Sequence, residues 1–318
     1  MAVQSATPTA RPRRRGWSKQ TRRNLVTGLG FISIWVVGFF AFNLYPMLAS
    51  FYFSFTEHHI RQPSEWIGPA NYAGLMRDEL FWRSLYNTAY MVLLGVPLGL
   101  LVSFVCALLL NLKVRGQSIY RVVYFLPSIV PVVAATMLWV WILNPTSGLL
   151  NSLLAYIGLR GPNWTGDPLW AKPSLILLGL WGMGNTIVIY LAGLQDIPQT
   201  LVEASELDGA SWWQRLWAVT IPLISPITLF NLIIGVIAAF QYFAQAYILD
   251  AAAGPNDDTL GAPLNSTLFY SIYLYQQAFI YLKMGVASAQ AWILFLIIMA
   301  CTIFLIRSSE RWTYYEGG

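Results

Sequence analysis

Charge is scarce in this chain, and the scarcity excludes most soluble protein classes. Only 10% of the 318 residues are charged and 57% are hydrophobic, whereas an ordinary soluble domain has about 25% charged residues. The 19 Lys and Arg and the 14 Asp and Glu cannot cover a soluble core of this size with a polar surface. The composition therefore predicts an integral membrane protein.

Cysteine and histidine are scarce too. Cys106 and Cys301 both lie in apolar runs, and His58 and His59 are neighbours in one polar stretch. Neither a disulfide framework nor a cluster of metal ligands can be built from these residues. We therefore expect no metal site, no catalytic residues and no cofactor bound by this chain.

Six apolar stretches are long enough to cross a bilayer. A hydrocarbon core of ~30 Å needs about 20 helical residues, because each residue advances ~1.5 Å. The sequence predicts an all-α protein with a six-span domain over 25–306, a basic and disordered arm before it (1–24) and a short tail after it (307–318). The predicted spans are 25–55, 84–111, 119–143, 173–195, 221–247 and 284–306.

Basic residues gather on one side of the predicted spans. The arm carries seven Lys and Arg and no acid, and 13 of the 19 basic residues fall on its side. The positive-inside rule then places both termini in the cytoplasm. The apolar run after the arm is about twice the ~7–15 residues of a signal-peptide core, so we expect an uncleaved anchor. The arm either fixes topology only or also binds anionic lipid, and Arg121 can extend to the headgroups from the first turn of the third span.

The predicted span interiors contain no acid, His or Lys. Ion-coupled transporters usually hold their proton or sodium ion with such groups, so this absence argues against them. No row of Arg suggests a voltage sensor, and no G-x-x-x-x-G-K-[ST] run suggests a nucleotide site in this chain. No internal repeat supplies a second half, so a transporter of this kind would need a second subunit and an outside energy source.

The polar segment between the fourth and fifth spans carries capping signals for two short helices. Thr200-x-x-Glu203 is a capping box, so we expect a helix to start at Thr200. Gly209 is placed to end that helix in a left-handed conformation. Ser211-x-x-Gln214 is a second capping box, whose helix should run until Pro222. Together these signals predict a helix–turn–helix elbow over 196–221 on the cytoplasmic face.

The elbow resembles the EAA loop of inner-membrane permease subunits of ABC importers, whose pattern is E-A-A-x3-G-x9-I-x-L-P. Ser205, Val219 and Ile221 are mild departures from it. The neighbouring Asp-Gly-Ala and Leu-Gln-Asp-Ile-Pro runs are similar to the carbohydrate-uptake, maltose-type branch, and the likeness extends into the last span at 285–292. The residues that match the coupling pattern are Glu203, Ala204, Ser205, Asp208, Gly209 and Pro222.

This resemblance implies a type I ABC importer permease fold in a prokaryotic plasma membrane. The elbow would be the coupling helix that docks on an ATPase subunit, with Glu203 contacting a basic residue there and Gly209 permitting the bend. The alternative for Glu203 is the capping role alone. The implied partners are a second six-span permease, two ATP-binding subunits that use ATP and Mg, an extracytoplasmic solute-binding protein and membrane lipid, with no nucleic acid. The chain itself would not be an enzyme.

A sugar path needs stacking aromatics and neutral hydrogen-bonding groups, because a sugar has apolar faces and many hydroxyls. The resemblance implies that sugar is held on the fourth and fifth spans, as in those members of the family that hold sugar within the permease. The alternative is that small residues let helices pack closely and that Asn and Gln bond between helices. Prolines 97, 127, 131 and 226 supply kinks, either for motion or as fixed geometry. In the fourth span Leu178, Gly182 and Asn185 share one face, with Trp181 beside them. The candidate path residues are Trp181, Gly182, Asn185, Gly235, Gln241, Tyr242 and Gln245.

Long predicted external loops offer a surface for the binding protein, through Asp257, Asp258 and the aromatic run 269–281. The leading interpretation is a sugar or oligosaccharide permease. One rival is an importer of another polar solute such as glycerol phosphate, which would favour basic groups along the path. A rival of another class is a membrane scaffold or enzyme that transports nothing, which would leave the elbow unexplained.

Overall fold

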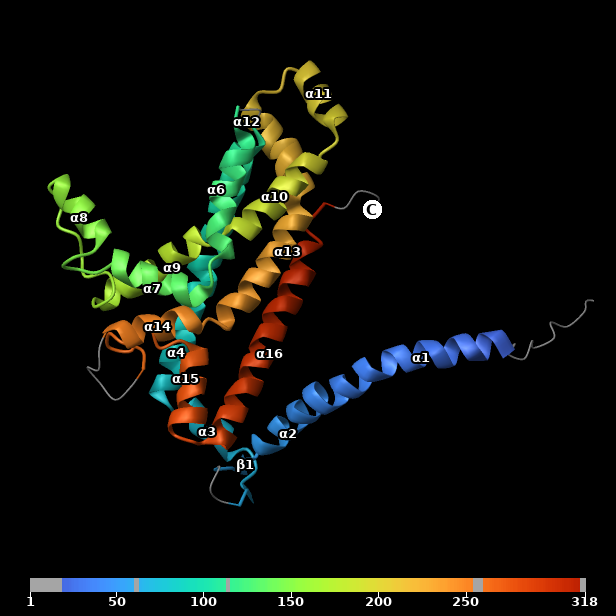
Figure 1. The fold of residues 1–318 in the computed structure, drawn as a ribbon, viewed down its shortest axis with the longest axis vertical. Helices are drawn as coiled ribbons and strands as arrows, with labels where there is room; N and C mark the ends of the chain where they lie inside the picture. The colour runs from blue at the N-terminus through green and yellow to red at the C-terminus, as the bar shows by residue number, and fades with distance from the viewer. Residues whose placement is uncertain (1–18, 60–62, 113–114, 254–259, 315–318) are drawn as a thin grey trace, which may run out of the picture. The chain divides into compact units, whose positions relative to one another are not determined.

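The computed structural model describes residues 19–59, 63–112, 115–253 and 260–314, and most of these residues are helical (Figure 1). The chain divides into two compact units, Met1–Tyr52 and Phe53–Gly318. Several features that the sequence singles out lie outside the described residues. They are the arm up to residue 18 and the side chains of Arg61, Lys113, Asp257 and Asp258.

The first unit is a long apolar helix. It contains α1 (Lys19–Phe39), the π-helical turn η1 (Phe40–Leu44) and all of α2 (Tyr45–Phe53) except its last residue, Phe53, which belongs to the second unit. None of residues 19–53 is buried, and Phe31 and Ile34 each expose 81% of their surface. Such an apolar surface suits lipid rather than water, which supports the first predicted span. The helix begins at Lys19, six residues before the predicted start of the span.

The second unit contains the remaining helices and one small sheet, in which β1 (Thr56–Glu57) pairs antiparallel with β2 (Glu65–Trp66). Its helices follow in chain order: α3 (Ala70–Met76), α4 (Glu79–Tyr90), η2 (Met91–Gly95), α5 (Val96–Asn111), α6 (Gln117–Ile129), α7 (Val132–Ile142), α8 (Leu149–Tyr156), α9 (Pro168–Trp181), α10 (Gly184–Asp196), α11 (Gln199–Leu207), α12 (Trp212–Arg215), η3 (Leu216–Thr220), α13 (Ile221–Phe240), α14 (Ala244–Ala253), α15 (Tyr270–Tyr275), η4 (Gln276–Ile280) and α16 (Met284–Ser309).

The described helices provide four to six candidate membrane spans. Four are long and apolar enough to cross without a sharp bend, and two bent pairs, α6 with α7 and α9 with α10, bring the count to six if each pair crosses once. The four are Lys19–Phe53, Glu79–Asn111, Trp212–Ala251 and Met284–Ser309. Every predicted span therefore coincides with a long apolar helix or with a bent pair.

The third predicted span consists of two helices that meet at a sharp bend. α6 and α7 are bent by 99°, and Val130 and Pro131 separate them. Pro131 has no N–H to continue the helix, and its ring disfavours the helical conformation for Val130, which is extended at ψ 129°. The proline that the sequence identifies as a kink therefore divides the segment into two helices.

The fourth predicted span is broken as well, by 50° between α9 and α10. Gly182 and Met183 form the break, and the N–H of Gly182 closes α9 on the carbonyl of Gly179 at 3.1 Å. Two glycines flank Met183, and glycine disfavours a continuous helix by about 1 kcal/mol per residue. Leu178 and Asn185 therefore lie on different helices rather than on one helical face as predicted.

Three π-helical turns end two residues before a proline: η1 before Pro46, η2 before Pro97 and η3 before Pro222. In each turn a backbone N–H bonds the carbonyl five residues back, as Ile221 bonds Leu216. The extra residue relieves the clash that a proline ring makes with the preceding turn of a regular helix. The second elbow helix therefore does not stop at Pro222, as the sequence predicts, but continues into α13.

The main core of the second unit lies among α4, α13, α15 and α16, with a second cluster among α5, α10 and α13. Phe269, Tyr270 and Ile272 are fully buried there. The aromatic run 269–281, which the sequence offers to a binding protein, is thus mostly core. Only its end, Phe279 to Tyr281, exposes large side chains.

Two charged residues lie in helices whose predicted spans contained none, because α9 begins earlier and α14 ends later than predicted. Asp250 of α14 is 8% exposed, and its Oδ1 accepts the backbone N–H groups of Gly261 (2.8 Å) and Ala262 (2.6 Å). Lys172 of α9 donates to Asn87 Oδ1 at 3.0 Å. Both charged groups hold other parts of this unit in place.

Candidate functional site

The elbow between α10 and α13 consists of α11, a turn and α12, and it forms one end of the second unit (Figure 1). No residue of α11 or α12 is buried. The elbow exposes apolar side chains as well as acids: Leu207 exposes 89% of its surface and Trp213 65%, and Trp217 in the following turn η3 exposes 67%. Exposed Trp and Leu in such number are typical of a surface that binds a partner or a membrane boundary.

The turn of the elbow depends on Gly209, as the sequence predicts. Its φ is +77°, in the left-handed region that only glycine adopts at little cost. The N–H of Gly209 bonds the carbonyl of Glu206 at 3.0 Å, and the N–H of Ala210 bonds that of Ser205 at 2.9 Å. This pair of bonds is the Schellman motif, which satisfies the last carbonyls of α11 and fixes the direction in which the chain leaves it.

One of the two predicted capping boxes is present. Ser211 Oγ accepts the N–H of Gln214 at 3.4 Å, and Gln214 Oε1 accepts the N–H of Ser211 at 2.7 Å, so α12 begins where predicted. The box predicted at Thr200 is wrong. α11 begins one residue earlier, after Pro198, which occupies the N-cap and has no side-chain acceptor. The capping alternative for Glu203 is thereby removed.

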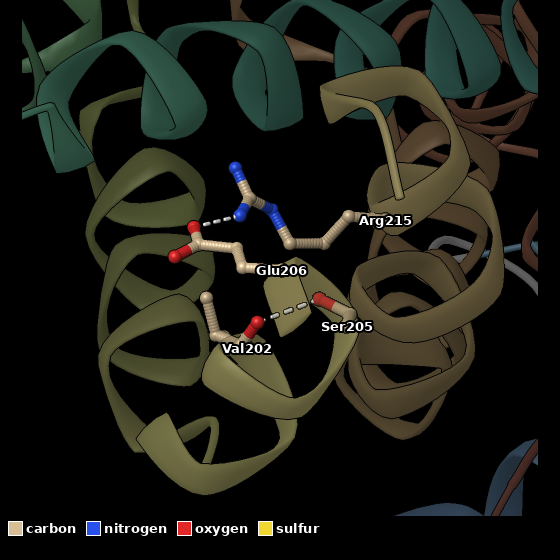
Figure 2. Close-up of polar contacts among 4 residues, drawn as sticks. All are labelled: Val202, Ser205, Glu206 and Arg215. Carbon is tan, nitrogen blue, oxygen red and sulfur yellow. Dashed lines mark hydrogen bonds and ion pairs between the residues drawn. The ribbon is translucent and has the colours of Figure 1, made fainter. Parts of the chain in front are cut away.

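An ion pair that the capping motifs do not predict joins the two helices of the elbow. Arg215 of α12 donates to the Glu206 carboxylate of α11, and Ser205 Oγ donates to the Val202 carbonyl within α11 (Figure 2). The pair links the two helices across the turn at Gly209. The signal was present in the sequence, since the opposite charges stand on either side of a predicted sharp turn. Glu206 is therefore engaged inside the chain.

The remaining acids of the elbow are open to solvent. Glu203 and Asp208 are exposed, as is Ala204, while Ser205 and Pro222 are half-buried. Among the described residues the ion pairs are Glu57 with His59 and Glu206 with Arg215, so neither open acid is paired there. The elbow thus presents two free carboxylates and several apolar side chains on a rigid turn, an arrangement that can bind a basic and apolar groove.

Six of the seven predicted path residues lie at or next to breaks in the helices, and Gly235 lies within α13. Trp181 packs edge-on against Trp139 of α7, with ring centroids 6.3 Å apart. Tyr242 packs edge-on against Phe269 at 5.4 Å, and its hydroxyl is buried without a hydrogen-bond partner. In the fourth predicted span, Gly182 forms the break and Asn185 is exposed at the start of α10. In the fifth, Gly235 packs on Val96. Gln241 is exposed and Gln245 is half-buried.

The backbone is nevertheless irregular at each of these breaks. The chain is non-helical at 130–131, 182–183 and 241–243. In a membrane such backbone is tolerated only where protein covers it or where it lines a polar cavity. Tyr242 lies in one of these breaks with its buried, unpartnered hydroxyl, which makes it the path candidate with the most direct structural support.

Comparisons with known proteins agree with this architecture. The family described as "Binding-protein-dependent transport system inner membrane component" matches residues 95–313. The chain is 39% identical over 303 residues to "Probable ABC transporter permease protein YesP" of Bacillus subtilis, covering 94% of this chain and 96% of that protein. It is 31% identical over 267 residues to "Sulfoquinovosyl glycerol transport system permease protein SmoG" of Agrobacterium fabrum, covering 83% and 84%.

Two further matches extend the comparison. The chain is 32% identical over 254 residues to "sn-glycerol-3-phosphate transport system permease protein UgpA" of Yersinia enterocolitica, covering 80% of this chain and 83% of that protein. In fold it is similar to a chain of a bacterial ABC transporter involved in the import of the acidic polysaccharide alginate, with a TM-score of 0.79 at 24% identity, covering 93% and 99%. The chain therefore belongs to the inner-membrane components of binding-protein-dependent transport systems and is similar over most of its length to ABC transporter permeases.

Proposed function

We propose that this chain is one of two permease subunits of an importer that takes up a sugar or oligosaccharide. In this proposal it crosses the plasma membrane of a prokaryote six times, with both termini in the cytoplasm. The observation that carries the proposal is the exposed elbow, in which a Schellman turn and an ion pair fix the direction of α11 while Glu203 and Asp208 stay open.

The elbow receives the energy that drives transport. A separate ATP-binding subunit, which uses ATP and Mg, docks on α11, and its closure moves the elbow as a rigid body. Because α12 continues through η3 into α13 without a helix end, a displacement of the elbow is transmitted directly to a membrane helix. A solute-binding protein outside the membrane delivers the sugar, and the paired permeases alternate between outward-open and inward-open states.

The sugar passes the helix breaks. Trp181 and Tyr242 offer ring faces, and Asn185, Gln241 and Gln245 offer neutral hydrogen-bonding groups. Gly182 leaves space beside them, while Gly235 lets α13 pack closely on Val96. The unpartnered hydroxyl of Tyr242 supports this assignment, since a buried donor without a partner is costly unless a ligand satisfies it.

The test is coupled transport in membrane vesicles that contain the whole assembly. Replacing both open acids, Glu203→Gln with Asp208→Asn, should lower sugar uptake at least about tenfold, because each lost charge-assisted contact contributes ~1.5–3 kcal/mol. Glu310→Gln, an exposed acid at the end of α16, is the matched control and should leave uptake unchanged. Normal uptake by the double variant would overturn the docking role of the elbow.

A second candidate is an anionic solute such as glycerol phosphate. Lys172 supports it, because this cation lies within the apolar helix α9, 5.3 Å and 5.1 Å from the ring centroids of Tyr86 and Tyr90. Competition of labelled sugar uptake by unlabelled glycerol phosphate and by an acidic oligosaccharide separates the two candidates. Competition by neutral sugars alone favours the first.

A further inference from the structure

A cavity of about 170 Å³ lies among α5, α6 and α10, outside the elbow and the proposed sugar path. It extends along α10 from Gly184 to Gln195, a rise of about 16 Å for 11 helical residues. Its wall is mostly apolar, and its charged group is Arg121 of α6. Val188 on the α10 wall exposes 43% of its surface and Ala192 is exposed too, so the cavity opens outward from the bundle.

Arg121 brings a charge into this cavity without a counter-charge. Its Nε is buried and has no hydrogen-bond partner. The ion pairs formed by the described residues join Glu57 with His59 and Glu206 with Arg215, so none of them includes Arg121. A guanidinium stays charged at every working pH and is costly at membrane depth unless it is paired. An acceptor from outside these residues would satisfy it.

One end of the cavity lies near the last residues of α5 and α10 and the start of α6. Leu110 is one residue before the end of α5, Gln195 is one residue before the end of α10, and Arg121 is in the second turn of α6. The side chain of Gln117, the first residue of α6, donates to the Leu110 carbonyl at 2.6 Å and joins two of these ends. Arg121 is about 6 Å along α6, a depth similar to the ~5–8 Å of one headgroup layer.

The cavity is polar toward these helix ends and apolar toward its deep end. The deep end is narrow because α10 approaches α6 closely: a Cβ at Gly184 would lie 2.8 Å from the Tyr124 carbonyl oxygen. A free phosphate ion would satisfy Arg121 but leave the apolar length empty. A phospholipid matches both parts, since its phosphate suits the planar donors of arginine and its hydrocarbon suits the wall along Val188 and Leu191.

We propose that this cavity binds an anionic phospholipid, with its phosphate on the guanidinium of Arg121 and part of a hydrocarbon chain along α10. The bound lipid neutralises the charge of Arg121 and fills the space between α6 and α10 close to the point where α10 leads into the elbow. The site is independent of which solute the importer carries.

The test is native mass spectrometry of the intact transport assembly, purified in a mild detergent and titrated with phosphatidylglycerol. The expected result is one tightly bound phosphatidylglycerol per chain, bound about fivefold more weakly after Arg121→Gln. Arg115→Gln, an exposed basic residue just before α6, is the matched control and should not change binding. Ala192→Phe fills the cavity without changing any charge and should also weaken binding.

Two comparisons identify the source of the phosphate. Phosphatidylcholine with the same chains should bind more weakly than phosphatidylglycerol, and millimolar inorganic phosphate should not displace the lipid. Equal binding by the wild type and Arg121→Gln would overturn the site, and displacement by inorganic phosphate would overturn the lipid as its ligand. If Arg121→Gln fails to fold, Ala192→Phe decides, because unchanged lipid binding in that variant also contradicts the proposal.

Discussion

The elbow and the segment from 260 to 283 both connect helices of the bundle, but they are held in opposite ways. The elbow is exposed, and its bonds join residues within ten positions of each other, such as Glu206 with Arg215. The segment 260–283 is largely buried, and distant helices hold it: Asn87 of α4 donates to the carbonyl of Leu268 at 2.9 Å, and Thr88 accepts the N–H of Tyr270 at 2.9 Å.

The difference indicates how each segment works. Because the elbow gains its shape from local bonds, its outer surface stays open, and in the proposed function it docks on a partner and moves as one body. The segment 260–283 gains its shape from the bundle, so a change in it affects the whole fold. Variants that remove single bonds should therefore lower stability most in 260–283 and coupling most in the elbow.

The largest loss of stability is expected from Asn87→Leu. The Asn87 side chain is fully buried, donates to two backbone carbonyls and accepts from Lys172. Leucine has a similar volume but leaves all three groups unpaired, which should cost about 3 kcal/mol or more of unfolding free energy. Thermal unfolding of the purified assembly measures it, with the exposed Asn185→Leu as control. Equal unfolding midpoints for the two variants would contradict the anchoring role.

A smaller loss is expected from Tyr273→Phe. The Tyr273 hydroxyl donates to Asp78 and accepts from Gln277 Nε2 at 2.8 Å, so its removal should cost about 1–3 kcal/mol. Burial, and then the hydrogen bond to Asp78, raise the pKa of Tyr273 above its ordinary value. The contribution of the Tyr273 hydroxyl to the free energy of unfolding is therefore complete at pH values below about 10, the ordinary pKa of tyrosine. It declines at higher pH, because the unfolded tyrosine then ionises. Unfolding curves from pH 7 to 11 should show the wild type and the variant converging at high pH, whereas the exposed Tyr281→Phe should follow the wild type throughout.

In the elbow, Gly209→Val should cost about 1–2 kcal/mol locally, because a β-branched residue is strained at φ +77°. Beyond the two neighbouring residues in the chain, no atom lies within 4 Å of the position that a Cβ would take, so the cost comes from the backbone conformation. Gly209→Asn tolerates the left-handed region and is the matched control. Uptake per ATP hydrolysed should fall in the valine variant and be largely kept in the asparagine variant. Equal ratios would mean that the turn does not set the coupling geometry.

The smallest change in stability is expected from Glu206→Gln. An exposed ion pair contributes less than about 1 kcal/mol, so the unfolding midpoint should hardly move. The coupling ratio should nevertheless fall, because the two elbow helices lose the contact that joins them. Exchanging the charges, Glu206→Arg with Arg215→Glu, should restore the ratio. If the exchange restores nothing, the pair is not what orients α11.

Much of the fold follows from local sequence. The apolar lengths predict the long helices, and Gly209 and the Ser211–Gln214 box predict the turn and the second elbow helix, because each signal acts within a few residues. The Thr200 box fails because Pro198 starts α11 one residue earlier. Pro131 and Gly182 show in the sequence where the two helices break. The bend angles of 99° and 50° cannot be predicted from it, because each angle depends on what the two halves pack against.

In the candidate site, too, features that depend on a short stretch are predictable and contacts between distant residues are not. The resemblance of the elbow to the EAA loop is contained in one short stretch, whereas the ring contact of Tyr242 with Phe269 and the hydrogen bonds of Asn87 join residues far apart in the chain. The burial of 269–278 was not predictable, because an aromatic run suits an exposed interface and a core equally well.

By itself the sequence determined that this protein lies in a membrane, where its long helices are and how the elbow turns, because apolar length and capping act over short distances. Only the tertiary structure decided that two spans are bent, that Glu206 is engaged by Arg215 while Glu203 is open, and that Arg121 faces a cavity without a counter-charge. Those facts depend on which helices pack together, and packing brings together residues that the order of the chain keeps apart.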